Sequence, residues 1–423
     1  MKNLLISRES YRITAVLWIV VTLLGSLPYV FSGTVDSFTD AVFESVSGFT
    51  TTGSTVVADP GTLPLWMRLW RALTQWIGGL GLVLFIVALV PSLREGSAQL
   101  YSAEFSGTQQ RKLHPRMANN VRRMWVIYTL MTVALVALLI LAGNSVSDSL
   151  CLALSTVSTG GFMTSASGLA GYSDLTLGVL TLIMFLSGVN VALIYNVFSF
   201  HWRRLRRSDE FIVYAVFYLL AVVMCAVAFG VTGNGWGRSL SYSLFHVAST
   251  VSTCGFYTSA PTVWPFAASV VTFLLIPCGA MAGSTGGGLK LRRLMSLALY
   301  LRNYFTRMLH PNAVFVVKID GQVVAPEYVN KIFGFVFLYI MFILFGAFAL
   351  TLTGSGIDEA FCLAAANIAN LGPTPIVGSA GAGLAYTALP AAAKWILMVL
   401  MLAGRLEIFA LMAVVSPAYW KKR

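Results

Sequence analysis

The chain has 423 residues, of which 57% are hydrophobic and only 10% are charged, and its mean hydropathy is +0.79. These values lie far outside the range of soluble globular domains. Many windows are long enough to cross about 30 Å of hydrocarbon at about 1.5 Å per residue. The composition predicts a polytopic integral membrane protein in a lipid bilayer and excludes a soluble domain.

The net charge of +12 indicates the orientation of this protein in the membrane. Most of the 28 Lys and Arg residues fall in the N-terminus, in the linkers 93–123, 201–208 and 289–331, and at 421–423. All these regions lie on one side if each repeated unit crosses out and back, so that side is predicted to be cytoplasmic, with both termini. Because the basic residues flank the spans, no nucleic-acid partner is predicted.

In chain order, the first apolar stretch is 13–31, which is too long for a signal peptide and has no small-residue cleavage site after it. Seven further spans are predicted. The four pairs are 13–31 with 65–90, 124–142 with 175–200, 211–231 with 263–301, and 329–353 with 391–416.

A short segment that ends in glycine lies between the two spans of each pair. The four segments are 40–53, 148–161, 242–255 and 359–372, and the second and third share the string STVST. Four such copies predict an all-α polytopic membrane fold, with four span–pore helix–span repeats arranged pseudo-fourfold around one central ion pathway. The repeats are predicted at 1–98, 99–208 with a basic cytoplasmic linker, 209–309 with an intramembrane loop, and 310–423.

The glycine at the end of each short segment suits a cation pathway. A dehydrated cation needs backbone carbonyls that face one axis, and glycine tolerates positive φ and close approach of neighbouring strands. The alternative is that each glycine merely ends a helix. Four glycines at equivalent positions favour the first interpretation.

Carboxylates gather on the predicted outer side. They are Asp36, Asp40, Glu44, Asp59, Asp148, Asp174, Asp358 and Glu359. Carboxylates around a pore mouth raise the local cation concentration, whereas Asp also caps helix N-termini. The two interpretations are compatible, and the pattern of carboxylates disfavours an anion channel.

The third unit contains irregular intramembrane sequence, PCGAMAGSTGGG at 277–288. This many glycines cannot form a stable helix, and non-helical backbone at membrane depth lies inside protein or lines a cavity. A nucleotide-binding loop would need Gly-Lys-Ser/Thr, but Leu289 and Leu291 flank Lys290. A packing kink is the remaining alternative.

Arg405 lies inside the last predicted span, where an ionisable side chain is costly and usually faces an interior cavity. A local ion pair with Glu407 is the alternative. Asn190 is a further polar candidate for lining the pathway.

Cysteine and histidine usage argues against an enzyme. The five Cys and four His residues are scattered, so no nucleophile–base pair, metal cluster or disulfide framework is predicted. A Na⁺- or H⁺-coupled cation carrier stays open, as does a weakly selective K⁺/Na⁺ channel.

Several motifs resemble one family over the whole chain. They are TTTGST at 50–55, QWIGGLG at 75–81, STGGF at 158–162, STCGF at 252–256, GSTGGGLK at 283–290 and AGRLEIF at 403–409, with the linkers 99–107 and 310–321. These residues resemble the Trk/Ktr/HKT superfamily of potassium transporters, and specifically its TrkH-like pore subunits. Such subunits usually carry two additional N-terminal spans, whereas this chain begins almost directly with the first unit.

The resemblance implies gated, K⁺-selective uptake, with K⁺ as the transported ion. The implied selectivity filter is Thr51, Thr52 and Gly53; Thr159, Gly160 and Gly161; Thr253, Cys254 and Gly255; and Asn370, Leu371 and Gly372. The implied gate is Gly279, Gly283, Ser284, Thr285, Gly286, Gly287, Gly288 and Arg405. No TVGYG string occurs, so this shorter filter is predicted to discriminate K⁺ from Na⁺ less sharply than a tetrameric potassium channel does.

The resemblance also implies partners and a location. A cytosolic TrkA-like subunit with RCK domains would bind NAD or an adenine nucleotide and control opening, while this chain would carry no organic cofactor. The family implies a homodimer in the cytoplasmic (inner) membrane of a bacterium, with one pore in each subunit.

Overall fold

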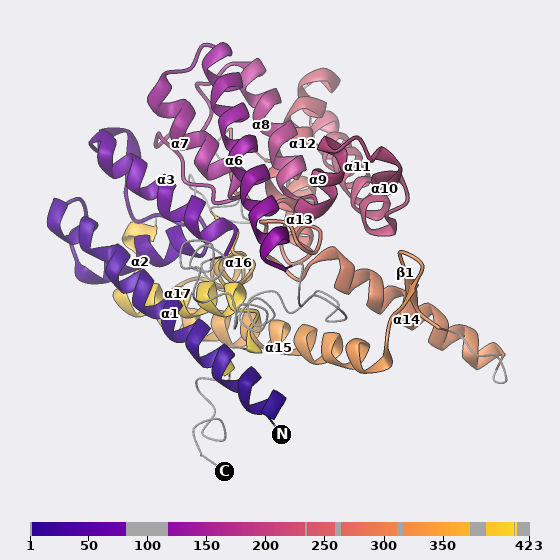
Figure 1. Cartoon of the computed structure of the whole chain (residues 1–423). Coiled ribbons are helices and arrows are strands. Elements are labelled where there is room, and N and C mark those ends of the chain that lie inside the picture. Colours follow the sequence, from indigo (N-terminus) through magenta and orange to yellow (C-terminus); the bar gives the residue numbers. More distant parts are fainter. Residues whose placement is uncertain are drawn as a thin grey trace.

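The computed structural model describes residues 2–81, 117–232, 235–258, 264–310, 316–372, 386–409 and 411–412. Nearly all regular structure in these residues is helical (Figure 1). The helices are α1 (Lys2–Ser32), α2 (Phe38–Phe49), α3 (Leu65–Gly79), α6 (Met117–Leu141), α7 (Val146–Val157), α8 (Asp174–Ser187), α9 (Val191–Phe198), α10 (Trp202–Arg206), α11 (Asp209–Val231), α12 (Trp236–Val251), α13 (Phe266–Leu275), α14 (Leu291–Leu309), α15 (Pro326–Thr351), α16 (Ile357–Ile368) and α17 (Ala391–Arg405). Short 3-10 turns cover Pro60–Thr62 and Tyr386–Ala388.

Each repeat begins with a long apolar helix. The stretches Arg12–Ser32, Arg122–Leu141, Asp209–Val231 and Pro326–Thr351 are each long and apolar enough to cross a membrane. Many of their large apolar side chains face outward, as Val216 and Leu220 do in α11. Outward apolar side chains on a helix with satisfied backbone suit contact with lipid. The predicted all-α membrane fold is confirmed.

A short helix follows each long one: α2, α7, α12 and α16. Three of them have 12 residues, about 18 Å, which is too short to cross the hydrocarbon layer. Nearly all residues in the inner half of each are buried. Ser37 and Ser145 cap α2 and α7, and each accepts a hydrogen bond from the backbone N–H three residues later.

The four repeats close into a ring. Each short helix packs against the long helix before it: α1 with α2, α6 with α7, α11 with α12, and α15 with α16. The helix after each short helix then reaches the short helix of the next repeat, as α3 does with α7, α8 with α12, and α17 with α2. Ile276, just after α13, packs against Ala365 of α16 and completes the circuit. In Figure 1, α2 and α17 accordingly lie side by side although they belong to opposite ends of the chain.

Two of the predicted second spans are not continuous helices. The helices α8 and α9 are bent by 110° at Gly188–Asn190, so the prediction of one span over 175–200 needs correction. The cause is a pair of backbone hydrogen bonds, from Met281 to the Gly188 carbonyl and from Val191 to the Gly283 carbonyl, which replace helical bonds. Residues 276–290 similarly separate α13 from α14. Of the predicted span 65–90, the part beyond residue 81 lies outside the described residues, as does the end of 391–416.

A hairpin that the sequence analysis did not predict precedes α15. Strands β1 (Lys318–Ile319) and β2 (Gln322–Val323) pair antiparallel, and Asp320 and Gly321 form the turn with positive φ. Asp-Gly is a strong signal for such a turn. The hairpin docks on the start of α11, because Asp209 and Asp320 exchange hydrogen bonds from backbone N–H to carboxylate.

Candidate functional site

Each short helix ends in the same backbone motif. Beyond the helix, one residue has left-handed φ: Thr51 (57°), Thr159 (55°), Thr253 (62°) or Asn370 (52°). The next residue returns its N–H to a carbonyl five residues earlier, as Thr52 does to Ser47. This is a Schellman ending, which ordinarily has glycine at the left-handed position. In three repeats a β-branched threonine takes that position at a cost of about 1–3 kcal/mol.

The geometry shared by the repeats places the glycines beyond the helix end. Gly53, Gly161 and Gly255 have φ between 80° and 82°, two residues after the left-handed residue. They therefore do not terminate their helices, and the interpretation of each glycine as a simple helix stop does not hold. We call Thr51–Gly53, Thr159–Gly161, Thr253–Gly255 and Asn370–Gly372 the four glycine segments.

The glycine segments touch one another in cyclic order. A Cβ on Gly53 would overlap the Gly160 carbonyl oxygen, and one on Gly161 would overlap the Cys254 carbonyl oxygen. A Cβ on Gly255 would lie 2.9 Å from the Gly372 nitrogen, and one on Gly372 would lie 2.8 Å from the Thr52 carbonyl oxygen. The backbones therefore approach so closely that every position in this ring requires glycine.

Side chains join the fourth segment to the first. Asn370 donates from Nδ2 to Thr52 Oγ1 at 3.1 Å and to the Met401 carbonyl at 2.9 Å. Ser54 donates to Asn367 Oδ1 at 3.1 Å. The bonds from Asn370 to Thr52 and from Ser54 to Asn367 join residues more than 300 positions apart, so they connect the fourth repeat to the first.

The helix α3 holds the first and second segments. Arg71 Nε donates to Glu44 Oε1 at 2.8 Å, and both side chains are almost completely buried. Arg71 also donates to Thr55 Oγ1 at 3.0 Å, and the Glu44 carboxylate accepts from the Val56 N–H at 3.0 Å. The ion pair thus fixes the strand that leaves the first glycine segment.

Three of the eight outer carboxylates form ion pairs with described residues. Glu44 is buried against Arg71, Asp40 lies 2.6 Å from Lys394 Nζ, and Asp148 lies 3.3 Å from Arg68. Glu44 therefore does not contribute a free charge at the outer mouth, contrary to the sequence interpretation.

The loop 276–290 lies against the third and fourth glycine segments. The Gly287 N–H donates to Thr253 Oγ1 at 2.6 Å. A Cβ on Gly286 would lie 2.6 Å from the Ser252 carbonyl oxygen, and one on Gly287 would overlap the Ala369 carbonyl oxygen. Gly279, Gly283 and Gly288 have φ of 66°, 77° and 74°, which side chains rarely adopt. The run of glycines is therefore needed for the close approach of this loop to the segments.

Polar side chains anchor the loop at its centre. Asn190 Nδ2 donates to the Ala282 carbonyl at 2.6 Å, and the Ala282 N–H donates to Glu210 Oε1 at 2.6 Å. Thr285 donates to the carbonyls of Val157 and Ser187 at 3.2 and 3.3 Å. Asn190 therefore holds the loop from the break between α8 and α9.

Arg405, the last residue of α17, lies beside the first glycine segment and the end of α3. Its Nη2 donates to the carbonyls of Gly78 and Gly79 at the end of α3, at 3.0 Å for Gly79. Its Nη1 lies 3.5 Å from Thr51 Oγ1. Glu407 accepts from Arg293 of α14 at 2.6 Å, so its carboxylate joins repeat 4 to repeat 3.

Arg405 and the loop enclose a narrow cavity of about 40 Å³. Its lining includes Gly79, Gly286, Gly287, Asn370 and Arg405. A cavity of this size holds a few water molecules and not an ion with its full hydration shell. Of the residues predicted from the sequence as a gate, this cavity is lined by Ser284, Gly286, Gly287, Gly288 and Arg405.

The chain matches the TrkH cation transport protein family over residues 2–233 and 211–422. It belongs to the TrkH family. The Trk system potassium uptake protein TrkH of Escherichia coli (strain K12) is 32% identical to this chain over 434 residues. The match covers 100% of this chain and 88% of that protein. TrkH of Halomonas elongata is 34% identical over 432 residues, 98% of this chain and 86% of that protein.

A solved TrkH structure has the same fold. The crystal structure of the potassium transporter TrkH from Vibrio parahaemolyticus superposes with a TM-score of 0.85 at 30% identity, and it covers 98% of this chain and 86% of that chain. The family assignment agrees with the resemblance found in the motifs. It also agrees with the expectation that this chain is not an enzyme.

The sequence analysis missed three buried polar side chains of this TrkH-type site. Arg71, Gln75 and Glu210 hold either a glycine segment or the loop. Arg71 and Gln75 lie in a predicted span, and Glu210 lies directly before one. An ionisable or amide side chain within a span is a signal that could have found Arg71 and Gln75.

Proposed function

We propose that this protein mediates potassium uptake across the cytoplasmic membrane of a bacterium through a gated, K⁺-selective pore. The four glycine segments form its selectivity filter, and their backbone carbonyls replace the water shell of the ion. The named relatives are potassium uptake proteins, which supports K⁺ as the transported ion.

The closed ring of glycine segments is the observation that carries this proposal. Four backbones from four repeats meet so closely that a Cβ would collide at each, and the strained threonines before them repeat the same φ. Strained backbone persists only where the surrounding structure over-determines it, and it clusters at functional sites. Carbonyls held in this way resemble the backbone rings that coordinate dehydrated cations.

The loop 276–290 and Arg405 form the gate of the proposed pore. The loop contacts the third and fourth segments from below, and Arg405 places a fixed positive charge beside the first. A cation that leaves the filter toward the 40 Å³ cavity therefore meets both a steric and an electrostatic barrier.

Regulation and assembly complete the proposal. A cytosolic RCK-domain subunit of TrkA type, with NAD or an adenine nucleotide bound, moves the loop away from the filter. The chain forms a homodimer with a separate pore in each subunit. Both termini face the cytoplasm, together with the basic linkers.

Growth and flux measurements test this function. The wild-type gene, expressed with its regulatory subunit, should restore growth of a bacterium without other K⁺ uptake systems at low external K⁺. Purified protein in liposomes should take up Rb⁺ and K⁺ in preference to Na⁺. Equal K⁺ and Na⁺ uptake would indicate a weakly selective channel, and a reversal potential that follows the pH or Na⁺ gradient would indicate a coupled carrier.

A further inference from the structure

Gln75 of α3 makes three hydrogen bonds to the second repeat. Its Nε2 donates to the Gly160 carbonyl oxygen at 2.7 Å. Its Oε1 accepts from the Ser155 hydroxyl at 2.7 Å and from the Phe162 N–H at 3.2 Å. The side chain is fully buried, so all its bonds are made to protein.

These partners determine the orientation of the amide. The Phe162 N–H can only donate, and the Gly160 carbonyl can only accept, so a flipped amide would place donor against donor and acceptor against acceptor. Gln75 therefore presents its NH₂ group to Gly160. Because the Gly160 oxygen also lies against Gly53, this bond fixes the contact between the first and second glycine segments.

The other repeats have no amide side chain at the position that corresponds to Gln75. The eleventh residue, counted from the first residue of α3, α8, α13 and α17, is Gln75, Met184, Ile276 and Met401. The seventh is Arg71, Leu180, Thr272 and Leu397. Only α3 therefore presents both an arginine and a glutamine, one helical turn apart, on the face toward the glycine segments.

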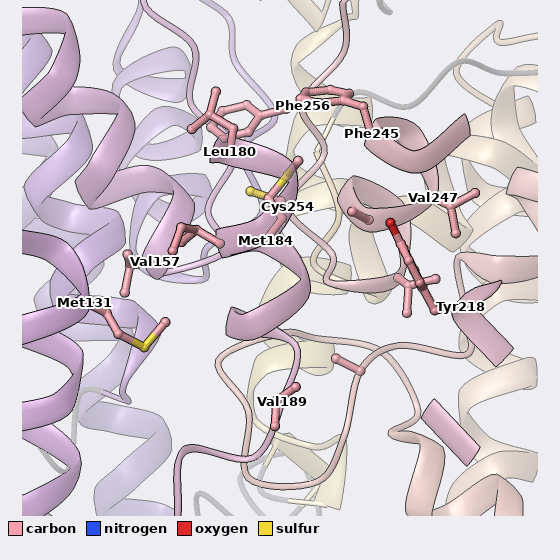
Figure 2. Close-up of a cluster of buried hydrophobic side chains, with 14 of the residues drawn as sticks. Met131, Val157, Leu180, Met184, Val189, Tyr218, Phe245, Val247, Cys254 and Phe256 are labelled. Carbon is pink, nitrogen blue, oxygen red and sulfur yellow. The ribbon is translucent and has the colours of Figure 1, made fainter. Parts of the chain in front are cut away.

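The corresponding site one repeat later is apolar. Met184 belongs to the same hydrophobic cluster as Cys254, the residue that precedes the third glycine as Gly160 precedes the second. Figure 2 shows both side chains, with Leu180 and Val189 of the same region. The pseudo-fourfold ring is thus supported by packing in one repeat and by a directed hydrogen bond in another.

We propose that Gln75 is a positioning residue for ion discrimination, because it holds the Gly160 carbonyl in place; this rests on the proposed filter. A carbonyl fixed by a hydrogen bond cannot move inward to coordinate the smaller Na⁺. The same bond polarises the carbonyl and alters the field that the ion meets. Both the cavity size and the field strength of the coordinating carbonyls bear on K⁺/Na⁺ selectivity. Gln75 thereby makes the first and second segments the more discriminating half of the ring.

The test is the ratio of K⁺ to Na⁺ uptake into liposomes at matched protein density. Gln75→Met keeps the side-chain length and removes the hydrogen bonds, so the ratio should fall about three- to tenfold, the equivalent of one lost hydrogen bond. Met184→Leu is the matched control at the same level of the next repeat, and its ratio should equal that of the wild type. Thermal unfolding of both variants reports on folding.

A second variant keeps the proposal testable if Gln75→Met does not fold. Ser155→Ala removes only the hydroxyl that orients the amide, and it should lower the ratio by a smaller factor at unchanged total flux. Wild-type protein without K⁺ preference would overturn the proposed function itself. If the wild type is selective and Gln75→Met has the wild-type ratio, the role of Gln75 alone is overturned. Where Gln75→Met does not fold, a wild-type ratio in Ser155→Ala overturns that role.

Discussion

The backbone N–H of Gly287 donates a 2.6 Å hydrogen bond to the hydroxyl oxygen of Thr253. One partner lies in the loop between α13 and α14, and the other is the left-handed residue of the third glycine segment. The equivalent hydroxyls of Thr51 and Thr159 donate instead to the preceding carbonyls. The loop is therefore bonded directly to the ring in one repeat, and its displacement must break this bond.

Thr253→Val should increase basal Rb⁺ flux, because it removes the hydroxyl that holds Gly287 while it keeps the β-branched shape. Loss of one such bond corresponds to an increase of about two- to tenfold. The measurement is Rb⁺ uptake into liposomes without a regulatory subunit. Thr159→Val is the matched control, since the Thr159 hydroxyl donates to the Ser158 carbonyl and, among the described residues, does not bond to the loop. Equal basal flux in the two variants would contradict a restraining role for the bond.

Arg405→Ala should also raise flux, with K⁺/Na⁺ selectivity retained. Two unit charges 4 Å apart repel by about 1 kcal/mol in bulk water and about 4 kcal/mol at an effective dielectric of 20. Even the smaller value corresponds to about a fivefold change in rate. Arg405→Lys keeps the charge and should stay close to wild type. A fall in flux for folded Arg405→Ala would contradict the role of Arg405 in the gate.

Shortening of the loop by deletion within 283–288 separates a gate from a packing kink. A gate predicts higher flux with unchanged selectivity, because a steric barrier has been removed. A kink predicts a misfolded third repeat. Size-exclusion chromatography of the purified variant distinguishes the two before flux is measured.

Glu44→Gln should destabilise the protein strongly. It keeps the shape of the side chain but leaves Arg71 buried without its carboxylate, and breaking one half of a buried pair costs about 3–5 kcal/mol. Arg68→Ala removes a partly exposed pair with Asp148, which is worth about 0–1 kcal/mol. Thermal unfolding in detergent compares them. Equal stability of the two variants would contradict the structural role of the Glu44–Arg71 pair.

The repeats and their short helices were predictable because both follow from local sequence. Apolar length determines the spans, and the STVST strings mark two equivalent helix ends. The break between α8 and α9 was not predictable, since it depends on backbone bonds from Met281 and to Gly283, about a hundred residues away. Local propensity carries no information about such tertiary bonds.

The side chains that hold the glycine segments were harder to predict than the segments themselves. The glycines were identifiable from their spacing, whereas the donors that hold them belong to neighbouring repeats. Gln75 contacts Gly160 across 85 positions, and Ser54 contacts Asn367 across 313. Likewise, Glu407 lies two residues from Arg405 in the sequence, and its carboxylate also bonds to Arg293 of another repeat. Sequence distance does not identify such a partner.

The most direct test of the account is the K⁺/Na⁺ permeability ratio of wild-type protein and Gly53→Ser, from reversal potentials in liposomes. A serine Cβ would overlap the Gly160 carbonyl oxygen at a position with φ of 82°, so the ring must widen. Gly178→Ser is the control, since a Cβ there meets open space. The account predicts a K⁺-selective wild type and control, and a clearly lower ratio for Gly53→Ser. An unchanged ratio in folded Gly53→Ser would contradict the four-glycine filter.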